Sequence, residues 1–235
     1  MNILITRPLI EAEDLMQKFF SLGHKIIHLP TLKISASNIE PINADDFDAF
    51  IFTSANAIRS LNLKNKNKNI TCFCVGSITE KFARQAGFTN TFSAGGTVNA
   101  LKNLIINSEK ITGKSNLAYF CGDNLSYDLD AELQREGLKI KKVINYFSKK
   151  ITDLNEENKR IIQHHPPDVI FVYSSRSAES FIEIIKNYSL YPLMTGSTVM
   201  CISKKVANLF TLDGWKKVKV FNPGEELLEL KDYKK

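Results

Sequence analysis

The stretch AFIFTSANAIRSL, residues 49–61, contains the pattern that decides the fold. Four apolar residues are followed by the adjacent hydroxyl residues Thr53 and Ser54, and then by a helical pattern. A continuous apolar run of this kind is typical of a strand buried on both faces, as in a parallel sheet covered by helices. The stretch VIFVYSSRSAESFI, residues 169–182, repeats the pattern. We therefore interpret the two stretches as copies of one strand–helix unit.

A second pair of segments supports an internal duplication. TCFCVGSITEKFARQAGF at residues 71–88 resembles TVMCISKKVANLFTLDGW at residues 198–215. Each reads as a strand, a tight turn, a helix, a glycine and an aromatic residue. The order and approximate spacing of the two segments are similar in both halves of the chain, which predicts two related lobes.

Strand and helix patterns alternate along nearly the whole chain, which predicts an α/β fold with mainly parallel sheets. The expected helices at 9–22, 78–85, 129–135 and 206–212 each end at a glycine, namely Gly23, Gly87, Gly137 and Gly214. The strands could form one wide sheet or two smaller ones, and the duplication favours two. We expect strands at residues 2–6, 25–29, 49–53, 71–75, 117–121, 139–143, 169–173, 199–203 and 218–221.

Two extended segments, residues 29–34 and 143–151, continue past the expected strands. We interpret them as the two connections between the lobes. One domain is then discontinuous and consists of residues 1–34 plus 149–235. The other consists of residues 35–148.

Composition and cysteine usage indicate a cytoplasmic globular protein. Hydrophobic residues make up 43% and charged residues 24% of the chain, as in ordinary globular proteins. No stretch reaches the ~18 uninterrupted apolar residues of a membrane helix, and the opening apolar run is broken at Arg7 and Pro8. All four cysteines lie in apolar, strand-like runs, where we expect buried core thiols: Cys72, Cys74, Cys121 and Cys201.

The net charge of +6 suits either a nucleic acid or a small polyanion. The obvious basic cluster, Lys64-Asn65-Lys66-Asn67-Lys68, lies between a helix and a strand, so we interpret it as a solvated loop. The other basic residues are scattered, and the chain contains no RNP-like motif, helix-turn-helix signature or zinc finger. A nucleic-acid partner is therefore not expected.

Common catalytic motifs are also absent, including glycine-rich phosphate loops, zinc-protease helices and nucleophile elbows. None of the histidines has a credible triad or metal partner in the sequence, so no metal is predicted. Two of them, His164 and His165, close a polar helix, where a cation suits the helix dipole. The other two are His24 and His28.

Hydroxyl and glycine residues recur where an expected strand passes into a helix. Ligands of open α/β sheets bind at this carboxyl edge, and helix N-termini there attract anions. Any one of these residues could simply cap a helix. Together, they predict an anion-binding cleft formed by both lobes. The set is Thr6-Arg7, Thr53-Ser54, Gly76-Ser77, Gly122-Asp123, Ser174-Ser175 and Ser203.

The order and spacing of several motifs resemble the uroporphyrinogen-III synthase family, from Ile3 to about Leu228. The most specific parts are ITRP, F-T-S-x-x-A and the late VINYF element. The matching pieces are ILITRP, LP-x-L, FDAFIFTSANAI, CFCVGSITEKFARQAGF, LAYFCGDNLSYDLDAELQREG, VINYF and VIFVYSSRSAESFI.

This resemblance implies a two-lobe α/β fold whose lobes are joined by a two-stranded antiparallel ladder, residues 32–35 and 145–149. It implies a cyclising hydro-lyase without a cofactor, which closes hydroxymethylbilane to uroporphyrinogen III in haem biosynthesis, with inversion of ring D and loss of water. The substrate carries eight carboxylates, which suits a basic protein. The implied partners are the bilane and the hydroxymethylbilane synthase that supplies it, with no nucleic acid and no membrane. We expect a monomer.

The resemblance also assigns residues. The family's tyrosine falls on Tyr146 of VINYF, whose phenol assists departure of the substrate hydroxyl; packing at the lobe junction is the alternative. Substrate-binding positions fall on Thr53 and Ser54, on Gly76 and Thr79, and on Ser174 and Ser175.

The sequence departs from the family at Ser203-Lys204-Lys205-Val206, where many members have a Gly-Pro-Thr-Thr-like turn. A lysine there could meet a substrate carboxylate as a point charge. A non-enzymatic two-lobe receptor for an anionic metabolite remains the alternative function.

Overall fold

The structure is a computed structural model that describes residues 1–65 and 67–230. Lys66, in the middle of the basic Lys64–Lys68 run, lies outside the described residues. The chain forms two compact units, one of Met1–Lys33 with Lys149–Lys235 and the other of Ile34–Ser148. None of the helices among the described residues is long and apolar enough to cross a membrane.

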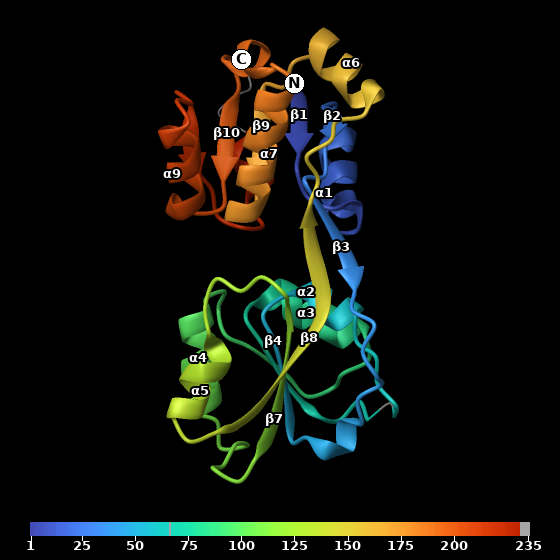
Figure 1. The fold of residues 1–235 in the computed structure, drawn as a ribbon, viewed down its shortest axis with the longest axis vertical. Helices are drawn as coiled ribbons and strands as arrows, with labels where there is room; N and C mark the ends of the chain where they lie inside the picture. The colour runs from blue at the N-terminus through green and yellow to red at the C-terminus, as the bar shows by residue number, and fades with distance from the viewer. Residues whose placement is uncertain (66, 231–235) are drawn as a thin grey trace. The chain divides into compact units, whose positions relative to one another are not determined.

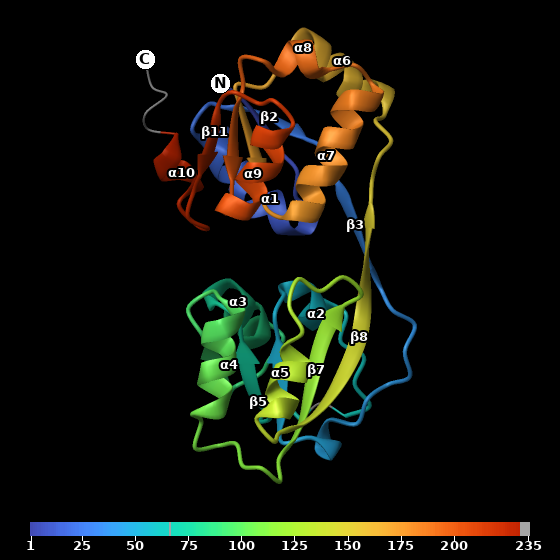
Figure 2. The same cartoon turned by 60° about the vertical axis from the view of Figure 1, so that its left-hand side comes forward.

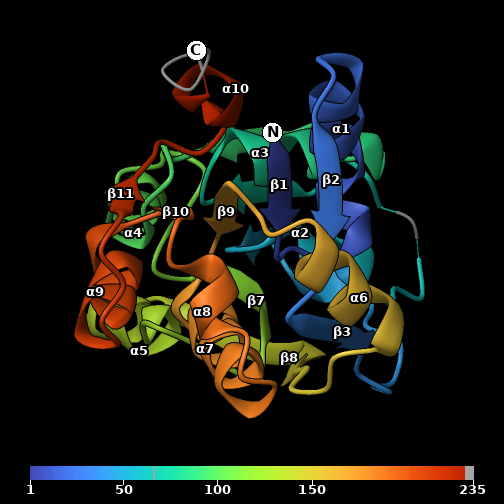
Figure 3. The same ribbon diagram turned by 90° about the horizontal axis from the view of Figure 1, so that it is seen from above.

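The first unit contains a five-stranded parallel sheet in the order β11-β10-β9-β1-β2 (Figure 3). The opening strand β1 therefore lies at the inside of the sheet, next to β9 from the second half of the chain. The strands are β1 (Asn2–Ile5), β2 (Lys25–His28), β9 (Val169–Val172), β10 (Thr198–Cys201) and β11 (Val218–Val220). The helices are α1 (Leu9–Ser21), α6 (Glu156–His164), α7 (Ser175–Asn187), α8 (Tyr191–Met194), α9 (Lys204–Leu212) and α10 (Glu226–Glu229).

Both faces of this sheet are covered, which explains why its inner strands are apolar without alternation. One face carries α7 and α9 (Figure 1). Phe181 of α7 and Phe210 of α9 pack with Trp215 in a single buried cluster. The other carries α1, whose Phe19 stacks on Phe171 of β9.

The second unit contains a six-stranded sheet in the order β3-β8-β7-β4-β5-β6. Helices α2 and α3 pack on one face, and α4 and α5 pack on the other (Figure 2). The strands are β3 (Leu32–Ala36), β4 (Ala49–Phe52), β5 (Thr71–Cys74), β6 (Thr91–Ser93), β7 (Asn116–Gly122) and β8 (Lys139–Lys150). The helices are the short 3-10 helix η1 (Ala44–Asp46), α2 (Ala55–Arg59), α3 (Ser77–Gln85), α4 (Val98–Ile106) and α5 (Leu129–Arg135).

The predicted α/β fold with two mainly parallel sheets is confirmed. All four glycines expected to end helices have positive φ angles, 81° at Gly23, 94° at Gly87, 83° at Gly137 and 90° at Gly214. The sequence analysis did not predict β6 or α4. Strand β6 has only three residues, of which Thr91 alone is buried, so it leaves almost no apolar signal.

The expected ladder is formed by β3 and β8. The amide of Ile151 donates to the Thr31 carbonyl (2.9 Å), and the amide of Ser37 donates to the Asn145 carbonyl (2.9 Å). Residue numbers rise on one strand as they fall on the other, so the pairing is antiparallel. On its other edge β8 pairs in parallel with β7. The chain passes between the two units within these strands, at residues 33–34 and 148–149.

Buried hydroxyl groups of α7 in the first unit hold both strands of the ladder at one end. The Ser180 hydroxyl oxygen lies 2.8 Å from the Thr31 carbonyl and 2.6 Å from that of Ile151, so its one proton is shared between them. The Thr31 hydroxyl lies 2.6 Å from that of Ser177, which donates to Thr6 (3.1 Å). This cluster stabilises the point at which the ladder joins the first sheet.

Ser180→Ala should therefore destabilise the first unit by about 1–2 kcal/mol, because the buried Thr31 carbonyl and the part-buried Ile151 carbonyl both lose their hydroxyl partner. Trp215, the single tryptophan, lies in the core of this unit and reports its unfolding by fluorescence in urea. The control Ser21→Ala removes an exposed hydroxyl from α1 and should stay within about 0.5 kcal/mol of the parent. Equal midpoints for the two variants would contradict the anchoring role.

Candidate functional site

The structure gathers the predicted residues at the carboxyl edges of the two sheets, in one group per unit. In each group they follow strands that are neighbours in the sheet, so residues far apart in sequence come together. The group of the first unit follows β1, β9 and β10: Thr6, Arg7, Ser174, Ser175, Ser203, Lys204 and Lys205. The group of the second unit follows or ends β4, β5 and β7 and includes a residue of β8: Thr53, Ser54, Gly76, Ser77, Thr79, Gly122, Asp123 and Tyr146.

Three of the serines cap helices. The side-chain oxygens accept backbone N–H groups: Ser54 from Asn56 (3.1 Å), Ser174 from Ser177 (3.0 Å) and Ser203 from Val206 (3.4 Å). Capping uses the oxygen as an acceptor and leaves the hydroxyl proton for another partner. A serine can therefore cap its helix and donate a hydrogen bond to a carboxylate at the same time.

Thr6 and Arg7 at the end of β1 already have partners within the first unit. The buried Thr6 hydroxyl donates to the Phe171 carbonyl (2.9 Å), so its proton is occupied. The Arg7 guanidinium lies 3.8 Å from the centre of the Tyr173 ring and 3.8 Å from the Glu11 carboxylate. Stacking leaves the edge of a guanidinium available for a carboxylate, so Arg7 keeps the geometry for anion binding.

Tyr173 was not singled out from the sequence. It directly follows β9, and burial raises the pKa of its phenol, an effect that the charge of Arg7 only partly offsets and that of Glu226 reinforces. The phenol is therefore neutral at physiological pH. The only sign of it in the sequence is its place at the end of the strand, directly before the hydroxyl pair Ser174-Ser175.

In the second unit, Thr53 is paired with another buried tyrosine. Its hydroxyl lies 3.1 Å from that of Tyr119 on the neighbouring strand β7. Burial raises the pKa of Tyr119, and the hydrogen bond with Thr53 offsets this only in part. Tyr119 therefore stays protonated, and one of the two hydroxyls can donate beyond the pair. The sequence could not show this, because the pairing depends on the β4–β7 register.

The β5–α3 turn mixes exposed and buried positions. Ser77 is exposed in the first turn of α3, whereas Thr79 faces the core. A Cβ on Gly76 would lie 3.2 Å from the Cα of Gly96 in the neighbouring β6–α4 loop, so this glycine also serves close packing.

Tyr146 lies on β8 opposite Gly122, the last residue of β7, next to a shift in register. Its half-buried ring packs against the apolar cluster beneath α2 and α3. The ring thus packs within the second unit, whereas the alternative drawn from the sequence was packing at the lobe junction. Packing and catalysis are compatible for a tyrosine, because the ring can be held by its faces while the hydroxyl points elsewhere.

Asp123 holds the β8 backbone. Its amide donates to the Tyr146 carbonyl (3.2 Å), and its carboxylate accepts the Ser148 amide (3.0 Å). A carboxylate repels carboxylates of a ligand, so this geometry suits a role in positioning β8 better than direct contact with an anion.

Lys204 and Lys205 occupy the first turn of α9 and are exposed. The helix dipole disfavours cations at a helix N-terminus. An anion bound at this turn would offset that cost, because it would attract both the lysines and the positive end of the helix dipole.

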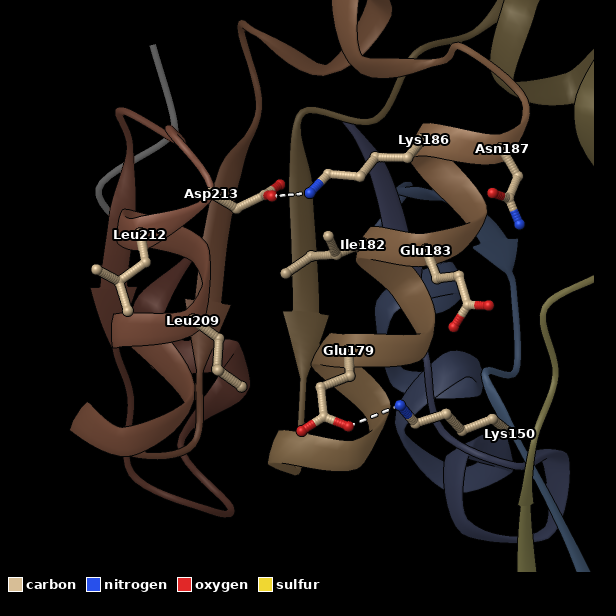
Figure 4. Close-up of a pocket in the computed structure, with 9 residues that line it drawn as sticks. All are labelled: Lys150, Glu179, Ile182, Glu183, Lys186, Asn187, Leu209, Leu212 and Asp213. Carbon is tan, nitrogen blue, oxygen red and sulfur yellow. Dashed lines mark hydrogen bonds and ion pairs between the residues drawn. The ribbon is translucent and has the colours of Figure 1, made fainter.

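The first unit also contains an open groove of about 490 Å³ along α7 and α9, outside both groups (Figure 4). Four of its charged residues form two ion pairs, Lys150 with Glu179 (2.7 Å) and Lys186 with Asp213. Leu209 and Leu212 line it from α9. The described residues that line this groove include no member of the predicted site.

Duplicated strand–helix units with hydroxyl groups and helix N-termini at their carboxyl edges define a class of α/β protein suited to binding a small anionic ligand. A family model described as uroporphyrinogen-III synthase HemD matches residues 13–222, which is most of the chain. The chain belongs to the uroporphyrinogen-III synthase family, whose members are enzymes of haem biosynthesis.

Solved structures support the fold. A uroporphyrinogen-III synthetase from Helicobacter pylori matches with a TM-score of 0.65 and 19% identity, covering 100% of this chain and 99% of that one. A mutant uroporphyrinogen III synthase from Thermus thermophilus matches with a TM-score of 0.55 and 15% identity, covering 100% and 97%. No curated protein matches the chain in a comparison of sequences.

The four cysteines are buried and free of disulfides, as expected for core thiols. Burial raises the pKa of Cys121 to about 11 and those of Cys74 and Cys201 to about 12, and it raises the pKa of Cys72 further. The thiols therefore remain protonated and unreactive in the folded protein.

We expect no thiol to react with Ellman's reagent in the native protein at pH 8, and all four to react in denaturant. The unfolded chain loses thiol protons above pH 9 while the folded chain retains them, so the free energy of unfolding should also fall as the pH rises above about 9. One equivalent of thiol reacting rapidly in the native protein would contradict this account.

Proposed function

We propose that this chain cyclises hydroxymethylbilane to uroporphyrinogen III, inverting ring D and releasing water as a hydro-lyase does. The observation that carries the proposal is the family match over residues 13–222. The two groups of donors at strand carboxyl edges support it, because the substrate is rich in carboxylates.

The reaction breaks the bond between carbon and the departing hydroxyl and forms a carbon–carbon bond that closes the ring, with loss of a proton from the pyrrole carbon that is attacked. Because ring D is inverted, the carbon–carbon bond that joins this ring to its neighbouring methylene group also breaks and re-forms at the other side of the ring. The reaction is redox-neutral overall, so it requires no oxidant or reductant. The intermediate left by the departing hydroxyl is a cationic azafulvene. A phenol beside that hydroxyl lowers the barrier by donating a proton as the hydroxyl leaves as water, and we assign this role to Tyr146.

The bilane closes spontaneously to isomer I, so an enzyme of this kind must mainly hold the chain in the conformation that leads to isomer III. Positioning is distributed over many donors. We assign substrate binding to the hydroxyls of Ser54, Ser174 and Ser203, whose oxygens cap helices, and to the backbone N–H groups at the start of α3, α7 and α9. The charged side chains Arg7, Lys204 and Lys205 attract the carboxylates.

We further infer a monomer in the cytoplasm that takes its substrate from hydroxymethylbilane synthase. Four buried, reduced thiols suit a reducing compartment. Because the bilane closes without an enzyme, a short path from the enzyme that makes it favours isomer III.

The decisive test is to generate hydroxymethylbilane in the presence of the purified protein and to separate the product isomers. We expect isomer III to dominate, against isomer I in the reaction without the protein. A non-enzymatic receptor for an anionic metabolite would bind the bilane and leave the isomer ratio unchanged. An unchanged isomer ratio would contradict the proposed function.

Tyr146→Phe should be the most damaging conservative substitution, lowering kcat about a hundredfold while the ring still packs, because a general acid contributes at least this much. Ser174→Ala should lower the rate about tenfold or less, as expected for one neutral hydrogen bond. The control Tyr191→Phe also removes a phenol hydroxyl, one that donates to Gly214, and should stay within about twofold of the parent. Steady-state rates of isomer III formation decide between them, and a fully active Tyr146→Phe enzyme would leave Tyr146 with packing alone.

A further inference from the structure

Gly122 and Tyr146 approach each other more closely than any side chain at position 122 would allow. A Cβ on Gly122 would lie 2.7 Å from two atoms of the Tyr146 ring, Cε2 and Cζ, and 2.9 Å from its hydroxyl oxygen. Separations below about 3 Å between such atoms are not tolerated, since carbon atoms in contact lie about 3.5–4.0 Å apart. The end of the Tyr146 ring therefore occupies the space that a side chain at position 122 would fill.

The conformation of Gly122 does not explain why a glycine stands there. Seven glycines among the described residues have positive φ angles, and Gly122 is not one of them. Any residue could adopt its backbone conformation. The close approach of the Tyr146 ring is the feature that requires the missing Cβ.

A β-bulge aims Tyr146 at this position. The β7–β8 register pairs Cys121 with Ile144 and then Gly122 with Tyr146, so β8 contains one extra residue, Asn145. A bulge of this kind places two successive side chains on the same side of the sheet. The contacts agree: Asn145 donates its side-chain amide to the Ala57 carbonyl of α2 (2.7 Å), and Tyr146 packs on the cluster beneath the same helix.

Backbone contacts hold the other side of this arrangement. Asn145 is fully buried, and its backbone carbonyl also accepts the Ser37 amide of the ladder. Asp123, the residue after Gly122, binds the Tyr146 carbonyl and the Ser148 amide. The backbone of Tyr146 is thus fixed by neighbours on both sides, and the direction of its ring is set by the space above Gly122.

We infer that Gly122 is a positioning residue for Tyr146, and that its missing side chain places the phenol hydroxyl where the reaction needs it. This inference rests on the proposed function. It reassigns Gly122, which sequence analysis placed among the substrate-binding residues, to a role that acts through Tyr146.

Gly122→Ala should allow folding but move the phenol. The atoms that meet the new methyl group are at the far end of a half-buried side chain, so the ring can swing aside while the backbone stays in place. Restoring ordinary contact requires a displacement of the ring of roughly 1 Å, and a misplacement of this size can cost up to a hundredfold in rate.

The experiment compares Gly122→Ala with the matched control Gly113→Ala in the same unit, where an added Cβ meets nothing within 4 Å. We expect Gly122→Ala to lower kcat for isomer III formation at least tenfold and no further than Tyr146→Phe does, with KM changed less than threefold. Gly113→Ala should remain within twofold in both constants. A Gly122→Ala enzyme with unchanged kcat, or with its loss confined to KM, would overturn the inference.

A double-mutant cycle separates positioning from a general structural effect. If Gly122 acts through the phenol, adding Gly122→Ala to Tyr146→Phe should lower kcat by less than about threefold, because the hydroxyl is already gone. If the double variant loses kcat by the product of the two single losses, the inference is wrong, while the proposed function of the unmodified protein still stands. If the parent itself yields isomer I alone, the proposed function fails instead, and the two failures are therefore distinguishable.

A folding measurement covers the case in which Gly122→Ala does not fold. Tyr146→Ala removes the ring that the new methyl group would meet. The double variant Gly122→Ala with Tyr146→Ala should then regain a cooperative thermal transition by circular dichroism, which supports the contact. If the double variant is also unfolded, the glycine is needed for another reason and the inference is wrong.

Discussion

Backbone hydrogen bonding along β8 is the constraint on which the rest of this structure depends. This strand of twelve residues pairs in parallel with β7 on one edge and antiparallel with β3 on the other. Its pairing with β7 ends at Tyr146, and pairing with β3 lets it continue beyond that residue to the point where the chain enters the first unit. The irregularity in its pairing with β7, at Asn145, sets the direction of Tyr146. A strand that only completed the sheet could have ended several residues earlier.

Hydroxyl groups serve two purposes in this fold. At helix N-termini the oxygens of Ser54, Ser174 and Ser203 accept backbone amides, which stabilises the helices and does not use the hydroxyl protons. Inside the first unit the hydroxyls of Thr6, Thr31, Ser177 and Ser180 have partners within the chain and hold the ladder to the sheet. The chemistry of the group is the same in both places, and what separates the roles is whether the proton already has an acceptor.

Burial keeps the thiols and the phenols of Tyr119 and Tyr173 neutral at the two carboxyl edges and in the cores beneath them. Neutral groups donate hydrogen bonds but make poor nucleophiles. A reaction that needs a folded substrate conformation and one proton at the departing hydroxyl suits such surroundings. It explains why the sequence can belong to an enzyme family and still contain none of the common catalytic motifs.

The sequence alone determined the architecture and the edges at which the candidate site lies. Unbroken apolar runs specify strands buried on both faces, and glycines such as Gly23 and Gly137 end helices because they adopt positive φ angles at little cost. These are local properties, and the internal duplication repeats the same patterns in both halves of the chain. The short strand β6 was not predicted, because its three residues derive their strand conformation from pairing with β5 rather than from their own composition. Only the tertiary structure decided which strand ends are neighbours. It also decided that the Thr6 hydroxyl donates to a backbone carbonyl and that Thr53 is paired with Tyr119. The same holds for the close approach of the Tyr146 ring, which needs a glycine at position 122. Each of these depends on the register between strands that are tens of residues apart in the chain. A register is set by the packing of whole sheets, so no local pattern around any one of these residues contains it.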